Sequence, residues 1–197
     1  MARPLEFDRE QALVAAMQLF WRQGYTATSM SQLLETMEIG RSSFYAAFTD
    51  KRSLFIEALD LFTARTLKLL QESRQQCGPL PAIREFFSHT LFDVPARRAR
   101  RGCLMVNTIL ELADVDDELS RRARDNLGQI EKEFESCLVQ AAASGELAST
   151  QDPAQLAQYL MMVNQGLRVA SRKHTPKPAM SAMLDTALSV IGPAAAG

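Results

Sequence analysis

The stretch that decides the fold is TSMSQLLETMEIGRSSFYAAF, residues 28–48. It holds two short segments in which apolar residues recur at helical spacing, with Gly40 between them. Ser29 and Gln32 have the spacing of a capping box, which predicts the start of the first helix. The second helix is expected over residues 41–48. Two short helices joined by a tight turn that contains glycine are typical of a helix-turn-helix.

The second of these helices has two different faces. At about 100° of rotation per residue, Phe44 and Phe48 share one side, whereas Ser42 and Tyr45 point the other way. We expect the phenylalanine pair to anchor the helix and the opposite face to remain free to enter a groove of DNA. Arg41 stands at the helix start, where recognition helices usually contact bases. Because arginine binds guanine O6 and N7 bidentately, Arg41 is the predicted base contact.

Side chains that can donate hydrogen bonds to phosphate oxygens surround this helix. Such contacts fix the register on DNA without reading its sequence, and the backbone N–H groups at the starts of neighbouring helices add to them. The predicted DNA-binding residues are Thr28, Ser29, Arg41, Ser42, Ser43, Tyr45 and Lys51. On periodicity alone, a plain three-helix packing unit with solvated polar residues is an equally good interpretation.

Helical spacing continues through the rest of the chain, and no strand pattern or internal repeat interrupts it. The predicted fold class is therefore all-α, with about nine helices. Seven of them are expected over residues 8–24, 29–39, 41–48, 102–113, 116–143, 152–174 and 180–191. The other two begin at residue 50 and residue 81 and continue beyond residue 70 and residue 91, respectively.

Composition sets limits on function. Apolar residues make up 47% of the 197 residues, which suffices for a buried core, and the formal net charge is −1. A nearly neutral chain has no overall field that attracts a polyanion, so contacts with nucleic acid must come from local placement. Three widely separated cysteines suit a reducing compartment, so we predict a cytoplasmic protein. We recognise no targeting segment and no membrane-spanning helix.

A resemblance to a known family strengthens the helix-turn-helix interpretation. The segment LFWRQGYTATSMSQLLETMEIGRSSFYAAFTDKRSLF, residues 19–55, resembles the N-terminal domain of the TetR family of bacterial transcriptional regulators. The matching residues are Gly24-Tyr25, Thr28-Ser29-Met30, Ile39-Gly40, Ser43-Phe44-Tyr45, Phe48, Lys51 and Leu54-Phe55. The segment LLETMEIG departs from the small residues that the family usually carries before the turn.

This resemblance implies the biological role and the partners. It implies a helix-turn-helix DNA-binding domain over residues 1–50 and a helical ligand-binding and dimerisation domain over residues 51–197. It also implies a homodimer formed by the last two helices, which binds a palindromic DNA operator, usually as a repressor, and is released by a small-molecule inducer. The alternative is that the last two helices cover only the core of their own chain and form no dimer interface.

Candidate pocket residues of the second domain are aromatic, methionine and polar side chains at helical spacing. They are Phe62, Phe86, Phe87, Met105, Asn107, Thr108, Ile109 and Met162. Aromatic and methionine side chains at this spacing more often form ordinary core, and that alternative applies to each of them.

The stretch RRARRGCLMVNTILEL points to a reactive thiol. Positive charge over residues 97–101 and a helix start both favour the thiolate form of Cys103. The Gly102-Cys103-Leu104 element resembles one TetR subgroup, some of whose members sense electrophiles or oxidants. We therefore expect Cys103 to respond to redox or electrophile signals. The alternative is a buried small cysteine behind a solvated basic loop.

Enzymatic motifs are not found. The sequence has no G-x-G-x-x-G, P-loop, H-E-x-x-H or G-x-S-x-G element, so we predict no catalytic residues, cofactor or metal site. The histidines, His89 and His174, are expected in surface contacts. The remaining rival is a helical interaction adaptor that does not bind DNA.

Overall fold

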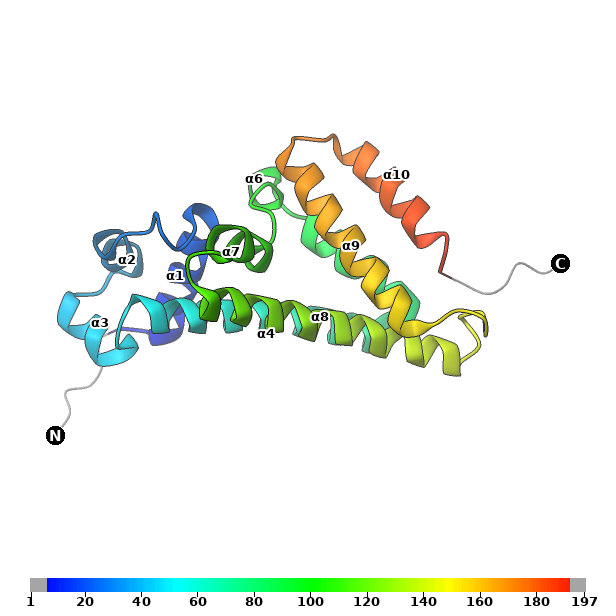
Figure 1. Cartoon of the computed structure of the whole chain (residues 1–197), viewed down its shortest axis with the longest axis horizontal. Helices are drawn as coiled ribbons and strands as arrows, with labels where there is room; N and C mark the ends of the chain where they lie inside the picture. The colour runs from blue at the N-terminus through cyan, green and yellow to red at the C-terminus, as the bar shows by residue number, and fades with distance from the viewer. Residues whose placement is uncertain (1–6, 192–197) are drawn as a thin grey trace. The chain divides into compact units, whose positions relative to one another are not determined.

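The computed structural model describes residues 7–191, and every regular element in this range is helical (Figure 1). The predicted all-α fold class is confirmed. The elements are α1 (Arg9–Gln23), α2 (Met30–Met37), α3 (Arg41–Phe48), α4 (Lys51–Cys77), α5 (Pro79–Phe87), the π-helical segment η1 (Ser88–Phe92), α6 (Ala96–Ala99), α7 (Leu104–Leu112), α8 (Asp117–Ala143), α9 (Pro153–Arg172) and α10 (Lys177–Leu188).

The nine predicted helices are all present within the described range, with two additions. The four-residue helix α6 forms inside the arginine-rich stretch, where no helix was predicted. The π-helical turn η1 directly follows α5 and extends it to Phe92.

The chain forms two compact units. Unit 1 comprises the described residues up to Ala64 together with Leu104–Asn126, and unit 2 comprises Arg65–Cys103 together with the described residues from Leu127 onward. Helices α4 and α8 contribute residues to both units. These units do not follow the predicted division after residue 50, because α7 and the first turns of α8 group with the N-terminal helices. The functional division into two domains remains a prediction.

Several helices begin where the sequence provides a side-chain acceptor for the first free backbone N–H groups. Asp8, Asp50 and Asp152 accept such hydrogen bonds at the starts of α1, α4 and α9. Ser29 and Gln32 form the complete predicted capping box of α2, with distances of 3.2 and 2.9 Å.

The core of unit 1 is built from aromatic rings on α1, α3 and α4. Phe20 packs edge-on against Phe55 with 4.8 Å between ring centroids, and Trp21 packs edge-on against Phe62 at 4.9 Å. Phe44 of α3 is completely buried in the same unit. Large aromatic surfaces of this kind supply much of the free energy that holds short helices in place.

The core of unit 2 centres on three phenylalanines. Phe134 of α8 lies with its ring centroid 5.0 Å from that of Phe86 and 6.2 Å from that of Phe87, both on α5. Buried leucines of α9 and α10, Leu160 and Leu184, belong to the same cluster. Within the described residues, no helix combines the length and apolar character needed to cross a bilayer.

Candidate nucleic-acid interface

The turn between α2 and α3 is shaped by a glutamate. Glu38 adopts a left-handed conformation with φ 55°, and its N–H donates to the carbonyls of Leu34 and Glu35. The next N–H, of Ile39, also donates to Leu34 O at 3.1 Å, and the Ile39 side chain is buried. These bonds are those of a Schellman-type helix end. We expected a glycine to make this turn, but Gly40 has an ordinary extended conformation with φ −74°.

Gly40 instead leaves the start of α3 open. It occupies the N-cap position of α3, and no side chain caps this helix. A β-carbon added at Gly40 would meet nothing within 4 Å. The first N–H groups of α3 therefore face outward without a side-chain acceptor, as at helix starts that bind phosphate.

The two faces of α3 are as predicted. Phe44 and Phe48 are buried, with 5.9 Å between their ring centroids. Arg41 and Ser42 are exposed, and the Tyr45 side chain is 50% exposed. The exposed face thus carries an arginine, a hydroxyl and a phenol group, all of which can donate hydrogen bonds.

Arg41 is available for a partner. It is the first residue of α3, and among the described residues it forms no ion pair. Tyr45 is held in position from behind, because its ring packs edge-on against Phe44 at 5.3 Å. Ser43 lies between the two faces and is partly buried.

Two predicted phosphate contacts have structural roles. For Thr28 this role replaces the predicted contact, whereas the Ser29 hydroxyl can still donate and its phosphate contact stays a prediction. Thr28 is completely buried, and its hydroxyl donates to Gly24 O at 2.6 Å while its N–H donates to Tyr25 O. Both of its donors are therefore used inside the protein. Ser29 is exposed, but its hydroxyl oxygen and its N–H are both engaged in the capping box with Gln32.

Lys51 lies at the start of α4 and is partly buried. Its ammonium group is 4.4 Å from the centroid of the Tyr25 ring. Burial lowers the pKa of Lys51, and the negative charge of Glu111 opposes this shift. The start of α4 itself is less suited to phosphate than we predicted, because the carboxylate of Asp50 already occupies it, accepting from Ser53 N at 2.7 Å.

Helix α7 holds the turn that precedes α2. The carboxylate of Glu111 accepts hydrogen bonds from the backbone N–H groups of Tyr25 at 3.1 Å and Thr26 at 2.6 Å. Gly24 lies against the same carboxylate, with φ 84°, and a β-carbon there would be only 2.4 Å from Glu111 Oε2. The backbone conformation favours glycine at this position, and a β-carbon here would also displace the Glu111 carboxylate.

A second polar contact joins α4 to the start of α8 within unit 1. The guanidinium of Arg52 binds both carboxylate oxygens of Asp116 and also contacts Glu118 at 2.8 Å. The hydrogen bond from Arg52 lowers the pKa of Asp116. Bidentate pairs of this kind combine charge with a fixed geometry. Arg52 follows Lys51 directly, so this contact fixes the first turn of α4.

The structure does not bring the eight predicted pocket residues together in one unit. Phe62, Met105, Asn107, Thr108 and Ile109 belong to unit 1, and Phe86, Phe87 and Met162 belong to unit 2.

In unit 1 these residues are engaged in packing and local hydrogen bonds. The sulfur of Met105 lies 3.9 Å from the hydroxyl of Thr63, and the hydroxyl of Thr108 donates to Leu104 O at 2.9 Å. Asn107 and Ile109 are partly exposed. In unit 2, Phe86 and Phe87 form ordinary core around Phe134, and the Met162 side chain is 66% exposed, which does not suit the wall of an enclosed pocket.

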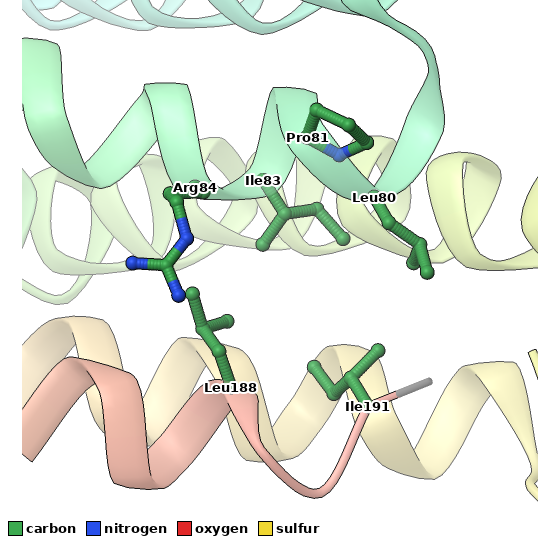
Figure 2. A pocket seen from close by; sticks show the side chains of 6 residues that line it. All are labelled: Leu80, Pro81, Ile83, Arg84, Leu188 and Ile191. Carbon is green, nitrogen blue, oxygen red and sulfur yellow. The ribbon is translucent and has the colours of Figure 1, made fainter. Parts of the chain in front are cut away.

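Unit 2 has an apolar groove elsewhere. It has a volume of about 300 Å³ and lies between the start of α5 and the end of α10 (Figure 2). Its lining residues are Leu80, Pro81, Ile83, Arg84, Leu188 and Ile191. The guanidinium of Arg84 is bound to Asp185 at 2.7 Å, so the single cation of the groove is already paired. None of the eight predicted residues lines it.

Cys103 is buried and has a buried cation within electrostatic reach. Arg168 of α9 is 6% exposed, donates to Asn164 Oδ1 at 3.2 Å, and forms no ion pair with a carboxylate of the described residues. Burial lowers the pKa of Arg168, whereas the charge of a Cys103 thiolate raises it. Burial raises the pKa of Cys137 to about 11.

Sequence reasoning missed Glu111, the pair Arg52–Asp116, and Arg168. Glu111 is 86 residues from Tyr25, Asp116 is 64 residues from Arg52, and no local pattern relates such distant positions. A single arginine in an otherwise amphipathic helix likewise gives no signal that it will be buried.

A short helix α3, anchored by two buried phenylalanines and exposing Arg41, defines this chain as a helix-turn-helix protein of the DNA-binding class. Comparison with known proteins agrees. Residues 12–58 match the family of bacterial regulatory proteins of the tetR family, and residues 79–186, more than half of the chain, match the tetracyclin repressor-like C-terminal domain. The chain therefore belongs to the TetR family and is a DNA-binding transcriptional regulator.

Individual relatives are regulators as well. The repressor ComR of Escherichia coli K12 is 29% identical over 174 residues, which cover 87% of this chain and 82% of ComR. The repressor NemR of the same organism is 29% identical over 64% of each chain. A cysteine mutant of the regulator CifR, solved with 26-base-pair operator DNA, is 30% identical, covers 96% of this chain and 100% of its own, and has a TM-score of 0.79.

The contact of Glu111 with the turn before α2 generates a stability prediction. Glu111→Gln removes a charged acceptor from two backbone N–H groups, so we expect the free energy of unfolding to fall by about 1.5–3 kcal/mol. Urea denaturation measures this change. The matched control is Asp114→Asn, which removes the same charge from an exposed position and should change stability by less than about 0.5 kcal/mol. Equal effects of the two substitutions would show that Glu111 does not hold this turn.

Proposed function

We propose that the protein is a homodimeric repressor that binds a palindromic operator through two copies of α3. The observation that carries this proposal is the outward-facing start of α3, where Arg41 stands beside uncapped backbone N–H groups. The protein's similarity to the repressors ComR and NemR, and to CifR in complex with operator DNA, supports the same role. Because its partner is chromosomal DNA, we place its action in the cytoplasm.

The proposed DNA contacts divide into two kinds. Arg41 contacts base edges, because it is exposed at the start of the helix that enters the major groove. Ser42, Ser43, Tyr45 and Lys51, with the free N–H groups of α3, contact phosphates. Thr28 is no longer included, because both of its donors are used internally. Ser29 contributes by fixing the start of α2.

The proposed dimer interface uses exposed apolar side chains on the last two helices. Met162 and Val169, seven residues apart on α9, are 66% and 50% exposed, and Gly166 lies between them with open space where a β-carbon would be. Met183 on α10 is also exposed. Residues seven apart lie on one side of a helix, so Met162, Gly166 and Val169 form a short apolar stripe on α9 that a partner can cover. We assign DNA binding to residues 1–50, and ligand binding and dimerisation to residues 51–197.

The proposed signal acts at Cys103 or at a small-molecule site that we do not assign to named residues. Cys103 directly precedes α7, and α7 carries Glu111, which holds the turn before α2. The Cys103 thiol adds across the C=C bond of an α,β-unsaturated carbonyl compound. An S–C bond forms at the start of α7, the C=C π bond breaks, and the thiol proton ends on the carbon next to the carbonyl. We propose that this change alters the contact of Glu111 and thereby lowers operator affinity. On this basis we place the chain in the subgroup with the Gly102-Cys103-Leu104 element.

A salt series of gel shifts tests DNA recognition. Arg41→Ala should cost about 1–3 kcal/mol of binding free energy and relax the preference at one base pair of each half-site. Lys51→Ala should weaken binding to all sequences alike and reduce the slope of log affinity against log salt by about 0.9 for each phosphate that the variant no longer neutralises. An unchanged slope for Lys51→Ala would remove Lys51 from the set of phosphate-binding residues. A chain that shifts no DNA at low salt would instead support the adaptor alternative.

Sedimentation measurements test the dimer interface with a matched pair of variants. Val169→Glu places a charge in the proposed stripe and should convert the dimer into a folded monomer, because an unpaired charge is costly in a buried interface. Val139→Glu makes the same change at a residue of α8 that is 53% exposed, and should leave the dimer intact. Dissociation by Val139→Glu alone would assign the interface to α8 and contradict the proposal.

Operator release by N-ethylmaleimide tests the thiol signal. The reagent should release DNA from the wild type, while Cys103→Ser should bind DNA normally and remain bound after treatment. Normal binding is expected because CifR binds its operator with several cysteines replaced. The control is Cys77→Ser, which removes an exposed thiol and should keep the wild-type response. Release that persists in Cys103→Ser would contradict the role of this thiol.

A further inference from the structure

A second cavity of unit 2 is lined by basic side chains. It has a volume of about 130 Å³ and is lined by residues of α6, of the end of α9 and of the start of α10. Its three titratable side chains are Arg100, His174 and Lys177, and no carboxylate lines it. The guanidinium of Arg100 and the ammonium of Lys177 give this cavity a local positive potential.

The start of α10 adds to this potential. Pro176 is the N-cap residue of this 12-residue helix and provides no side-chain hydrogen bond to the first turn. Pro176 and Lys177 both line the cavity. The partial positive charge of the helix start therefore lies at the cavity wall, with one N–H fewer than usual because Pro178 has none.

A hydroxyl in the wall has no partner among the described residues. Ser171 is 3% exposed and lines the cavity. Among residues 7–191, its side chain takes part in no hydrogen bond, and its oxygen is not one of the fully enclosed unpartnered atoms. The hydroxyl is therefore free to donate to a ligand oxygen in the cavity. Thr175 places a second hydroxyl in the same wall.

The backbone carbonyl oxygens at the end of α9, which would repel an anion, already accept hydrogen bonds. The end of α9 also lies at this cavity, but Ser171 O accepts from His174 N at 3.1 Å and Ala170 O accepts from Thr175 N at 3.1 Å. The ammonium of Lys177 donates to the carbonyls of Phe92 and Val94, which are neutral, so its charge is not compensated by a carboxylate.

We propose that this cavity binds a small tetrahedral oxyanion of the phosphate class. The volume corresponds to about four water molecules at roughly 30 Å³ each, which suits an anion of five heavy atoms. The donors come from three elements, with Arg100 after α6, Ser171 on α9 and Lys177 on α10. Donors on three sides match an ion with oxygens in every direction better than a planar carboxylate. Bound oxyanion links α6 to the α9–α10 turn and stabilises the folded state.

Calorimetric titration of the full chain with inorganic phosphate, at constant ionic strength, tests this site. Saturable binding is expected, together with a melting temperature that rises with phosphate concentration; sulfate should act likewise and acetate should not. Arg100→Gln should weaken phosphate binding at least tenfold, and Ser171→Ala several-fold. The matched control is Arg97→Gln, which removes the same charge from an exposed position on α6 outside the lining and should bind phosphate as the wild type does.

Two further measurements separate this site from the DNA interface. Arg41→Ala and Lys51→Ala should leave phosphate binding unchanged, and Arg100→Gln should leave operator binding unchanged. Absence of saturable phosphate binding overturns the proposal, as does equal weakening by Arg97→Gln, which would indicate diffuse attraction. Loss of phosphate binding in the Arg41 or Lys51 variants would assign the phosphate to the DNA interface and also overturn it.

Discussion

The burial of Phe44 and Phe48 is the constraint on which the function of this protein depends. An eight-residue helix is not stable in water by its own hydrogen bonds, so α3 exists because these two rings are inserted into the core of unit 1. Burying one face fixes the rotation of the helix about its axis. Arg41 and Tyr45 are thereby turned outward, and the Tyr45 ring also packs against Phe44.

A second set of constraints determines how a distant event reaches this helix. Glu111 and the Arg52–Asp116 pair make α7 and the start of α8 part of the same compact unit as the helix-turn-helix. Both interactions are polar and directional, so they are sensitive to small displacements in a way that packed apolar surfaces are not. A typical coupling of about 1–3 kcal/mol between effector and DNA is of the size that breaking one such charged hydrogen bond provides.

Local patterns predicted much of this structure. Helix starts at Asp8, Ser29 and Asp152, and the two faces of α3, follow from capping and from the helical period, which involve only neighbouring residues. The turn at Glu38 was not predicted, because glycine is the usual residue in a left-handed conformation. In this turn, hydrogen bonds to Leu34 O and the burial of the Ile39 side chain stabilise the left-handed conformation of Glu38.

The candidate site was predicted less completely, because burial and long-range contacts decide which polar groups remain available. Thr28 has the right chemistry for phosphate, yet it is buried and its donors are used. The predicted pocket residues were chosen by chemical type, and they lie in different units. Glu111 gave no sequence signal, because its partners Tyr25 and Thr26 lie far away along the chain. Arg168 gave none, because no local pattern shows that an arginine of an amphipathic helix will be buried.

Hydroxyl-radical footprinting of the DNA upstream of the chain's own coding sequence tests the central claim most directly. Two copies of α3 should protect two segments related by two-fold symmetry, with centres about 34–36 Å apart or at a multiple of that distance. Protection of a single asymmetric segment, or none, would contradict the account.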